Sequence, residues 1–334
     1  YVRRCRKSPT RVKELNQVQL LVIDEISMLG KSIIEKLDVV FRVIRKTPKP
    51  FGGIQVLFAG DFYQLPPVKD DWCFHSKVWD DLNLEIHNLS KPQRHKSDKP
   101  FFRMLMRIRE GKPKKKDLIA LQGKHIKYFQ MTEEERSALP AVMLFPTNNN
   151  VDHYNQSRLD ELEEKEFIYS ATYSTKEAKK ASRSVLGDND VLVFKKGSQV
   201  MLTVNLDVTE GLVNGATGIV ESCGPGYVHV RFVNGVSKLM EKYEYIIDEE
   251  QGIKAWQIPL RLAWAISIHK SQSATIDMVV IDLGNCFENG QAYVALSRCR
   301  SLDGIYLTDF NTKSIKVNGD VVDFFATPAP DGGV

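Results

Sequence analysis

Two acidic residues close an apolar segment near the start of the chain, in the stretch Leu-Leu-Val-Ile-Asp-Glu at 20–25. An apolar strand with Asp24 and Glu25 at its carboxyl end is the Walker B arrangement, in which the Asp holds Mg²⁺ through water and the Glu polarises an attacking water. Ligands of open α/β sheets bind beyond the carboxyl ends of the strands, so this position fits a nucleotide site. Taken alone, the stretch is also compatible with a strand that ends in a solvated acidic turn.

A second polar segment, Gly-Asp-Phe-Tyr-Gln-Leu-Pro-Pro-Val at 60–68, follows the next apolar run. Gln64 at this position can contact the γ-phosphate of a nucleotide, and the turn at Pro66 and Pro67 makes a rigid loop at the edge of the site. An ordinary turn is the alternative. The presence of both segments at this spacing weighs against that alternative.

Two further segments near the end of the chain carry cationic and hydroxyl side chains. The stretch His-Lys-Ser-Gln at 269–272 offers hydrogen-bond donors for phosphates. The stretch Tyr-Val-Ala-Leu-Ser-Arg at 293–298 places Arg298 where a cation can meet a nucleotide held by the first half of the chain. Each segment alone is more typical of a helix cap and of a surface helix.

The elements that must position these residues alternate in the first part of the chain. Residues 19–24 are predicted to be a buried strand, residues 32–45 have helical spacing, and residues 54–59 are a second buried strand. Strand, helix and strand in this order predict a βαβ unit and therefore a parallel sheet. Residues 91–117 are predicted to be a loop and then a helix, whose apolar face holds Phe101, Phe102, Leu105, Met106 and Ile108.

The middle of the chain begins with another short apolar strand, at 141–145. A polar Pro-Thr-Asn-Asn-Asn segment follows this strand and leads into an amphipathic helix that runs through Leu162. Residues 170–190 are polar and rich in Ser and Lys, so we expect a loop or a mobile insertion there.

The later part of the chain changes character twice. Between residues 191 and 258, short alternating segments separated by Gly and Asn predict a small antiparallel β module. After Pro259 the pattern of a parallel sheet returns, with strands at 279–283 and 305–307 and a helix at 291–298. A β insertion inside a second α/β domain accounts for this order.

Composition excludes several classes of protein. The chain has 334 residues, enough for about two domains, and its 43% hydrophobic and 26% charged residues exclude disorder as the main state. No apolar run approaches the ~18 residues of a membrane-spanning helix, and the start of the chain has no signal-peptide core. The five cysteines are scattered without a Cys-x-x-Cys pair, which indicates reduced thiols and not a disulfide framework or a zinc site.

The net charge of +4 hides a local asymmetry. Residues 91–117 hold eleven Lys and Arg against three Asp and Glu, and residues 1–13 hold six Lys and Arg and no acid. The rest of the chain is therefore net acidic. Basic patches on an acidic body predict a localised site for a polyanion.

Taken together and in this order, the segments resemble the Pif-type (petite integration frequency) DNA helicases of superfamily 1. The motifs that carry the resemblance are LLVIDEISM, GDFYQLPPV, AWAISIHKSQ followed by ATID, and YVALSR, and the resemblance covers roughly residues 15–310. It implies an α/β fold with two RecA-like parallel-sheet domains, the second carrying a small antiparallel β-barrel insertion. The implied boundaries are 1–95 for the C-terminal part of the first RecA-like domain, 96–204 and 256–325 for the second, and 205–255 for the barrel.

The resemblance also implies a role for each matching residue. Asp24 and Glu25 match the Mg²⁺-binding and water-activating acids of an ATP site, and Gln64 matches the glutamine that contacts the γ-phosphate. Arg94 and Arg298 match two arginine fingers. The residues that match DNA-contacting positions are Thr147, Asn148, His269 and Lys270 for the DNA backbone, and Pro66 and Pro67 beside the DNA track.

Three departures from the family pattern stand out. The family has Gln where this chain has His95, and Gly where it has Ser273, which is expected to stiffen or shift that turn. The 334 residues contain no GxxxxGK[ST] phosphate loop. The stretch Gly-Lys-Ser at 30–32 is not one, because Glu25 stands where such a loop needs a small residue. We therefore expect a partial chain whose parent protein has the phosphate loop.

The resulting prediction is an ATP-dependent 5′-to-3′ DNA helicase that uses ATP and Mg²⁺ and acts on single-stranded, tailed or forked DNA. Two alternatives stay open, a non-catalytic single-strand-binding module derived from a helicase and another superfamily 1 motor of the RecD-like kind. We expect a monomeric motor with no membrane association. The resemblance implies a nuclear or mitochondrial location, and a viral source stays open.

Overall fold

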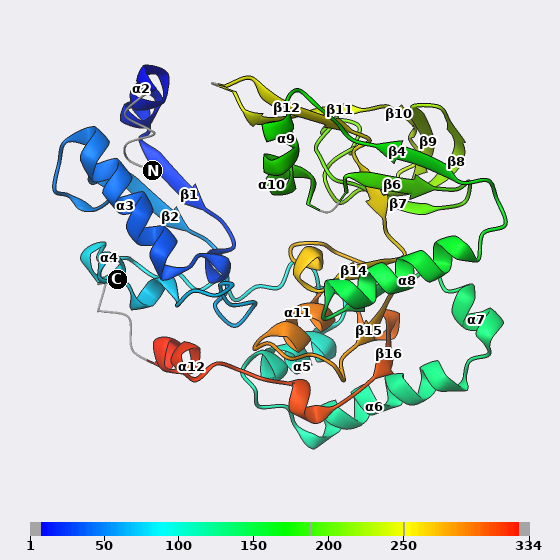
Figure 1. The fold of residues 1–334 in the computed structure, drawn as a ribbon. Coiled ribbons are helices and arrows are strands. Elements are labelled where there is room, and N and C mark those ends of the chain that lie inside the picture. Colours follow the sequence, from blue (N-terminus) through cyan, green and yellow to red (C-terminus); the bar gives the residue numbers. More distant parts are fainter. Residues whose placement is uncertain (1–7, 188, 250, 327–334) are drawn as a thin grey trace. The chain divides into compact units, whose positions relative to one another are not determined.

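The computed structural model describes residues 8–187, 189–249 and 251–326 (Figure 1). Part of the basic segment at 1–13, and with it Cys5, lies outside these residues. In the part that the structure describes, no helix is long and apolar enough to cross a membrane. The cysteines described there are free thiols, in agreement with the sequence-based prediction: Cys73, Cys223, Cys286 and Cys299.

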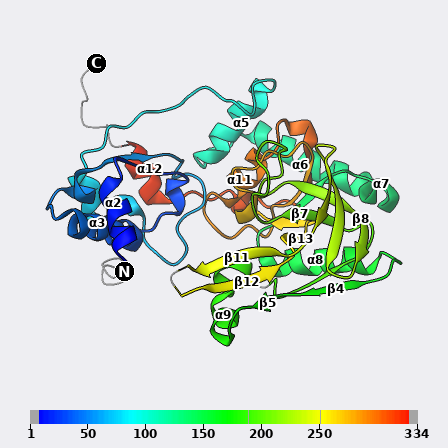
Figure 2. The ribbon, with the colours of Figure 1, turned by 90° about the horizontal axis from the view of Figure 1, so that it is seen from above.

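The described residues form two compact units, and each is treated by itself below (Figures 1 and 2). The first unit takes the described residues within 1–138, 275–277 and 281–334. The second takes those within 139–274 and 278–280. Both units combine helices with strands, which confirms the predicted α/β class.

The first unit begins with the predicted βαβ arrangement. Strand β1 (Leu20–Ile23), helix α3 (Lys31–Arg45) and strand β2 (Gln55–Phe58) follow one another, and the two strands pair in parallel. The helix is amphipathic and buries Ile34 and Phe41 against the core. Because both strands end at the same edge, the turns after β1 and β2 lie next to each other.

The burial of these two strands differs from the prediction of fully buried strands. Leu21 and Ile23 of β1 pack against the core, whereas Leu20 and Val22 are 49% and 54% exposed, and Leu57 of β2 is 53% exposed. In the described part of the chain, β1 and β2 form a two-stranded sheet, and the side chains on one of its faces are the exposed ones. The alternating exposure follows from the two-residue repeat of a strand with one covered face.

An aromatic cluster forms the centre of the first unit. The ring centroid of Phe62 lies 4.9 Å from that of Phe74, 5.9 Å from that of Trp72 and 5.1 Å from that of Phe324. Phe324 belongs to helix α12 (Gly319–Ala326). The last described helix therefore shares a core with the loop after β2, a long-range packing that the sequence pattern did not indicate.

Helix α5 (Lys99–Arg109) lies inside the basic segment and matches the predicted helix there. Its apolar face is shifted slightly from the prediction, because Met104 is buried whereas Met106 is only partly so. Two helices follow it in the same unit, α6 (Lys115–Gln130) and α7 (Glu133–Ser137).

The remaining elements that lie wholly or partly in the first unit are short. They are α2 (Pro9–Gln17), the 3-10 helices η1 (Ile26–Met28), η2 (Pro50–Gly53) and η3 (Cys73–His75), α4 (Lys77–Asp81), β15 (Val279–Asp282), α11 (Gln291–Ser297), η5 (Leu302–Gly304), β16 (Ile305–Asp309) and η6 (Thr312–Ser314). The strand β15 crosses from the second unit into the first.

A second parallel strand pair carries the other predicted motifs. Strands β3 (Val142–Phe145) and β14 (Ala265–Ser267) pair in parallel within the strand order β14-β3-β15-β16. Helix α8 (Asn148–Asp160) follows β3, and its buried Asn155 both donates to and accepts from the backbone of Ala265, at 3.0 and 2.8 Å. This pair of hydrogen bonds fastens α8 to β14.

Most of the other strands of the second unit form antiparallel sheets, as predicted for residues 191–258. The largest has the order β10-β9-β8-β7-β13, with β7 (Gln199–Leu202), β8 (Thr217–Gly224), β9 (Tyr227–Phe232), β10 (Ser237–Met240) and β13 (Leu260–Leu262). The smaller ones contain β4 (Phe167–Ser170), β5 (Thr172–Tyr173), β6 (Val191–Phe194), β11 (Tyr243–Asp248) and β12 (Ile253–Gln257). These sheets use strands on both sides of the segment 205–255.

The prediction of a loop or mobile insertion at 170–190 is wrong. This segment contains β5 and two short helices, α9 (Lys176–Ala181) and α10 (Arg183–Leu186). The hydroxyl oxygen of Thr175 accepts a 3.0 Å hydrogen bond from the amide of Ala178, and this cap starts α9. Ala178, Ser182 and Leu186 are buried, so a few small or apolar side chains anchor a polar segment whose composition resembles that of a loop.

Candidate nucleotide site and DNA-binding segments

The turn after β1 holds the two predicted acids in a strained backbone. Asp24 accepts a 2.8 Å hydrogen bond from the amide of Glu25, and Glu25 has a left-handed backbone with φ of 51°. The amide of Ile26 then donates to the carbonyl of Ala59, at the end of β2. A left-handed residue other than glycine costs about 1–2 kcal/mol, and such strain is typical of functional sites that their surroundings hold in place.

Asp24 fits a magnesium ion that is shared with a nucleotide. Its side chain is exposed beyond the strand end. Magnesium in phosphate sites takes one or two carboxylates and completes its shell with phosphate oxygens and water. Within the described ranges, no group of three or more His, Cys, Asp or Glu side chains is placed to hold a metal on protein ligands alone. The carboxylate of Asp24 is thus a suitable single protein ligand.

Gln64 lies in a tight turn that Asp61 organises. The amide of Gln64 donates to the Asp61 carbonyl at 2.9 Å, and the amide of Tyr63 donates to the Asp61 carboxylate at 3.1 Å. Pro66 after it is partly buried and Pro67 is buried, which pins the following loop to the unit. The backbone around Gln64 is therefore fixed on both sides of the residue.

The same turn lies against the start of helix α11, which carries the last predicted motif. Gly290 precedes α11 with φ of +73°. A Cβ at this position would lie 2.5 Å from the carbonyl oxygen of Tyr63 and would also overlap the carbonyl oxygen of Gln64. Only glycine leaves room for this approach, so the Gln64 turn and the helix of Arg298 touch through their backbones.

The two predicted arginine fingers lie close together in the first unit. Arg94 donates from Nε to the hydroxyl of Thr275 and from Nη1 to the carbonyl of Ser297, both at 2.9 Å. Arg298 is only 3% exposed, and it donates to the carbonyl of Val294 at 2.9 Å and to the Ser297 hydroxyl at 2.7 Å. The structure therefore brings both arginines to the end of α11.

Electrostatics connect these arginines to the acid of the β1 turn. Burial and, to a lesser extent, the positive charge of Arg94 lower the pKa of Arg298 to about 10, against the opposing effect of Tyr293 and Glu25. The pKa of Arg94 is also lowered, mainly by burial, and Glu25 again acts against the shift. Burial raises the pKa of Tyr293 to about 12. Glu25 thus lies within the electrostatic range of both guanidinium groups.

Several residues of this site were not identified from the sequence. Thr275 lies 181 positions from Arg94, Asp61 was noted only as a member of a longer motif, and Gly290 lies just before the predicted helix without being singled out. Their contacts are long-range, so the local spacing of residues does not indicate them. The glycine that precedes the predicted helix, Gly290, was a usable signal, because glycine is favoured where two backbones approach closely.

The stretch Gly-Lys-Ser at 30–32 has a local structural role. The amide and hydroxyl of Ser32 donate to the carboxylate of Asp70, at 3.2 and 2.6 Å. The first turn of α3 is therefore occupied by a carboxylate. The contact with Asp70 gives the Gly-Lys-Ser stretch a structural role that involves no phosphate.

His95 and Ser273, the two departures from the family pattern, have clear environments. His95 is 7% exposed, and its Nε2 lies 2.8 Å from the carbonyl oxygen of Cys299, which requires that this nitrogen donates. Its ring packs against Phe101, with centroids 5.4 Å apart. Ser273 has φ of 64°, the left-handed backbone that favours glycine, so the serine adopts the glycine conformation at a cost of about 1–2 kcal/mol.

The predicted DNA-contacting residues of the second unit follow two paired strands. Phe145 and Ser267 are opposite each other at the ends of β3 and β14. The 3-10 helix η4 (His269–Ser271) follows β14, and the hydroxyl oxygen of Thr147 caps α8 by accepting from the amide of Asn150. Both segments therefore start from one edge of the parallel strands, and their predicted contact residues are Thr147, Asn148, His269 and Lys270.

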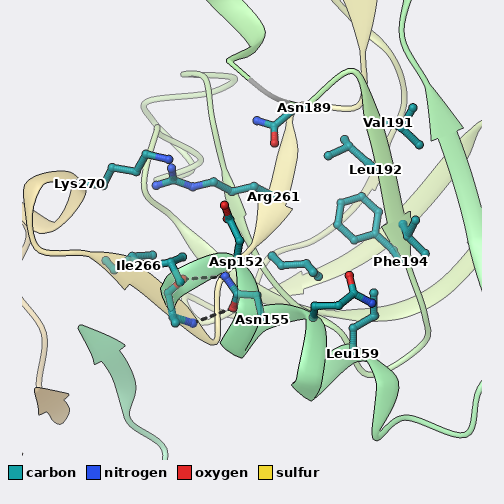
Figure 3. A pocket seen from close by; sticks show the side chains of 15 residues that line it. Asp152, Asn155, Leu159, Asn189, Val191, Leu192, Phe194, Arg261, Ile266 and Lys270 are labelled. Atoms are coloured by element: carbon teal, nitrogen blue, oxygen red, sulfur yellow. Dashed lines mark hydrogen bonds between the residues drawn. The ribbon is translucent and has the colours of Figure 1, made fainter. Parts of the chain in front are cut away.

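A cavity of about 240 Å³ adjoins Lys270 in the second unit (Figure 3). Asp152 and Arg261 line it together with Lys270. The rest of the wall consists of apolar side chains from α8, β6, β13 and β14 and of the polar Asn155, Gln156 and Asn189. In the described structure the Nε of Arg261 is buried without a hydrogen-bond partner, and burial lowers the pKa of this side chain. The sequence pattern gave no reason to single out Arg261.

Comparisons with known proteins agree with the motifs. The sequence model of the PIF1-like helicase family matches residues 2–118, and that of the DNA helicase Pif1 2B domain matches residues 188–222. The ATP-dependent DNA helicase Pif1 of Bdellovibrio bacteriovorus is 34% identical over 334 residues, which cover 96% of this chain and 73% of that protein. The chain belongs to the PIF1-like helicase family. This confirms the resemblance on which the sequence-based prediction rests.

Other PIF1 relatives align over a smaller part of their length. The ATP-dependent DNA helicase PIF1 of Danio rerio is 38% identical over 320 residues, which cover 91% of this chain. The same alignment covers 48% of the Danio rerio protein. The chain thus spans about half the length of this vertebrate relative.

Solved Pif1 structures share the fold. The Pif1 helicase of Candida albicans superposes with a TM-score of 0.86 at 28% identity, over 97% of this chain and 80% of that one. A Bacteroides Pif1 solved with ADP-AlF3 and single-stranded DNA has a TM-score of 0.75 at 30% identity, over 96% and 77% of the two chains. Another Pif1 structure, of two coordinating helicases at forked double-stranded DNA, gives 0.73 at 30% identity, over 96% and 76% of the chains. These matches confirm the predicted fold class.

Proposed function

We propose that this chain provides part of an ATP-dependent DNA helicase that moves 5′ to 3′ on single-stranded DNA. The observation that carries the proposal is the grouping of Arg94 and Arg298 in the electrostatic range of Glu25, with the Gln64 turn against the same helix. Acids at a strand end, a glutamine and two cations are groups that take part in nucleotide hydrolysis. The Bacteroides relative solved with ADP-AlF3 supports nucleotide use by the family.

Each residue has a proposed part in hydrolysis. Asp24 holds Mg²⁺ together with the phosphates of ATP, and the bound ion supplies charge neutralisation there. Glu25 orients and polarises the attacking water. Gln64 contacts the γ-phosphate, and Arg94 and Arg298 stabilise the charge that develops on it. The 334 residues contain no GxxxxGK[ST] phosphate loop, so we assign none of them to a cradle for the β-phosphate.

On the DNA side, we propose backbone contacts from Thr147, Asn148, His269 and Lys270. Hydroxyl, amide and cationic donors at the ends of paired strands suit phosphates and read no sequence. Pro66 and Pro67 are proposed to lie beside the DNA track. The relatives solved with single-stranded DNA and at forked DNA support single-stranded, tailed or forked DNA as the partner class.

The match to Pif1 proteins in particular favours this proposal over a RecD-like motor. A non-catalytic binding module is the second candidate, since a chain without a phosphate loop can still bind DNA.

Domain boundaries at 95, 204 and 255 and a nuclear or mitochondrial location remain predictions. A monomeric motor is also a prediction, and the relative that acts as two coordinating helicases makes the number of copies worth measuring.

An ATPase assay on the full-length natural protein, with and without single-stranded DNA, tests the proposal. We expect hydrolysis that DNA stimulates, and Glu25→Gln should abolish turnover while the protein still binds nucleotide, because Asp24 keeps its magnesium-binding carboxylate. Asp24→Asn is the companion variant and should weaken nucleotide binding that depends on Mg²⁺. Near wild-type turnover by Glu25→Gln would contradict the role of Glu25, and DNA binding without any hydrolysis would favour the non-catalytic module.

A further inference from the structure

Arg109, the last residue of α5, makes a two-pronged ion pair with the loop that carries Gln64. Its Nε and Nη2 donate to the two carboxylate oxygens of Asp61, at 2.8 and 2.7 Å. Both side chains are mostly buried, with 21% and 16% of their surface exposed. A paired arginine–carboxylate contact of this kind is among the strongest hydrogen-bonded arrangements in proteins and also fixes the direction of both groups.

The guanidinium group is also enclosed by aromatic rings. Its central carbon lies 4.1 Å above the ring of Tyr63 and 5.4 Å from the ring centroid of Phe325. Those two rings stack on each other, with centroids 4.9 Å apart and an angle of 10° between the planes. Stacked rings over a partly desolvated cation add to its attachment. The ion pair with Asp61 and the two aromatic rings therefore restrict the movement of the Arg109 side chain.

The partner of Arg109 is the residue on which the Gln64 turn is built. The Asp61 carboxylate accepts from the amide of Tyr63, and the Asp61 carbonyl accepts from the amide of Gln64. Whatever fixes Asp61 therefore fixes the turn and the direction in which the side chain of Gln64 leaves it. Asp61 and Arg109 are 48 positions apart in the sequence, so this dependence is purely tertiary.

We propose that Arg109 is a positioning residue for Gln64. It clamps Asp61 in one orientation and so keeps the γ-phosphate glutamine aligned, without touching the nucleotide itself. The inference rests on the proposed function, because the alignment of Gln64 matters only if the site hydrolyses ATP. Lysine at this position cannot reproduce the planar two-pronged contact, so the proposal requires arginine specifically.

The same helix offers a matched control. Arg107 donates from Nε and Nη2 to the two oxygens of Asp117, at 2.7 and 2.6 Å. Its partner lies in the first turn of α6, away from the Gln64 turn in the sequence. Arg107→Gln removes an ion pair of the same geometry from the same helix. A difference between the two variants therefore reports on the turn and not on the loss of an ion pair in general.

Steady-state hydrolysis of ATP by the full-length natural protein, with saturating single-stranded DNA, provides the first measurement. We expect Arg109→Gln to lower kcat about 10- to 100-fold, as a small misplacement of a catalytic group does, with KM for ATP changed less than about twofold. Arg109→Lys should recover little of this loss. Arg107→Gln should stay within about twofold of wild type in both constants. An Arg109→Gln variant with unchanged kcat, or an equal loss in Arg107→Gln, would overturn the proposal.

Hydrogen exchange on the chain described here provides a second measurement that needs no turnover. Peptides that contain the amide of Gln64 should exchange faster in Arg109→Gln than in wild type, and those in Arg107→Gln should not. Unchanged exchange in Arg109→Gln would overturn the positioning role even if its turnover were low. Absent ATP hydrolysis in the wild-type protein would count against the proposed function instead, and the exchange result would still decide whether Arg109 orders the turn.

Discussion

Arg94 donates a 2.9 Å hydrogen bond to the backbone carbonyl of Ser297, whose hydroxyl in turn accepts a 2.7 Å hydrogen bond from Arg298. One serine thus connects two arginines that are widely separated in the sequence. Arg298 is buried and Arg94 is partly buried. The charge of Arg94 lowers the pKa of Arg298, and Glu25 opposes the lowering of the pKa at both arginines. We infer that the two proposed arginine fingers are positioned together, so changes at one will affect the other.

Replacement of Arg298 is expected to affect chemistry more than substrate binding. Arginine fingers contribute on the order of 10³ or more in rate, and lysine lacks the planar fork that bridges phosphate oxygens. Arg298→Lys should therefore be nearly as inactive as Arg298→Ala in a DNA-stimulated ATPase assay on the full-length protein.

The neighbouring Arg300 provides the control for that substitution. It is a more exposed arginine that pairs with Asp277 at 2.6 Å. Arg300→Lys should retain close to wild-type turnover. Full activity in Arg298→Lys would show that this side chain only holds the end of α11 to its own backbone.

Gly290→Ala is expected to destabilise the first unit through two separate effects. An alanine with φ of +73° is strained by about 1–2 kcal/mol, and its Cβ would overlap the carbonyl oxygens of Tyr63 and Gln64. The overlap should add at least ~1 kcal/mol, as overpacking does. Denaturant unfolding of the chain, compared at equal slope, measures the sum.

Gly226→Ala separates the two effects. Gly226 has a similar backbone, with φ of +85°, and a Cβ there would meet no atom within 4 Å. This variant should show the strain alone. Equal losses of stability in the two variants would mean that the contact between the Gln64 turn and α11 is loose.

Sequence patterns were sufficient for elements whose residues are close in the chain. The strand of residues 20–23 and the helix of residues 31–45 follow from the spacing of their apolar residues. The antiparallel segments follow from alternating apolar and polar residues in short runs that Gly and Asn turns separate. The exposed face of β1 was not predictable, because a run of Leu and Val has the same composition whether one face is covered or both are.

Long-range pairs are the part that spacing does not encode. Asp61 lies in a sequence motif and Arg109 lies in a predicted basic helix. No feature of either segment indicates that the two side chains form an ion pair. Thr175 and Ala178 show the same limit at short range. A polar, Lys-rich segment forms two short helices that are held by the Thr175 cap of α9 and by the burial of Ala178, Ser182 and Leu186.

His95 should make the stability of the chain depend on pH. Burial lowers the pKa of His95, the charges of Arg94 and Arg298 lower it further, and the hydrogen bond to Cys299 and the charge of Asp98 oppose the shift. Below about pH 6.5 the unfolded chain therefore binds a proton that the folded chain resists. The free energy of unfolding should therefore fall as the pH drops from 7.5 to below about 6.5. The same drop in pH should lower the free energy of unfolding less in His95→Gln than in wild type.

The control for this measurement is a histidine in solvent. His87 is 75% exposed, so His87→Gln removes a histidine without removing a buried ring. Glutamine at position 95 also keeps a donor for the carbonyl of Cys299, which limits the loss of stability at pH 7.5. An unchanged pH dependence in His95→Gln would mean that this ring is protonated as easily in the folded chain as in the unfolded one.

Lys270 should contribute to DNA affinity through the phosphate backbone and not through base recognition. It follows β14 at the edge that also carries Thr147 and Asn148, and it lines the same cavity as Arg261. Each phosphate contact on a single strand contributes about 0.7 to the slope of log K against log salt. Lys270→Gln should weaken binding of oligonucleotides of different sequence by the same factor and reduce that slope by ~0.7. Lys77 is an exposed lysine outside the proposed DNA track, so Lys77→Gln should change neither the affinity nor the salt slope. If the affinity of the wild-type protein did not vary with salt, the proposed contacts to the DNA backbone would be contradicted.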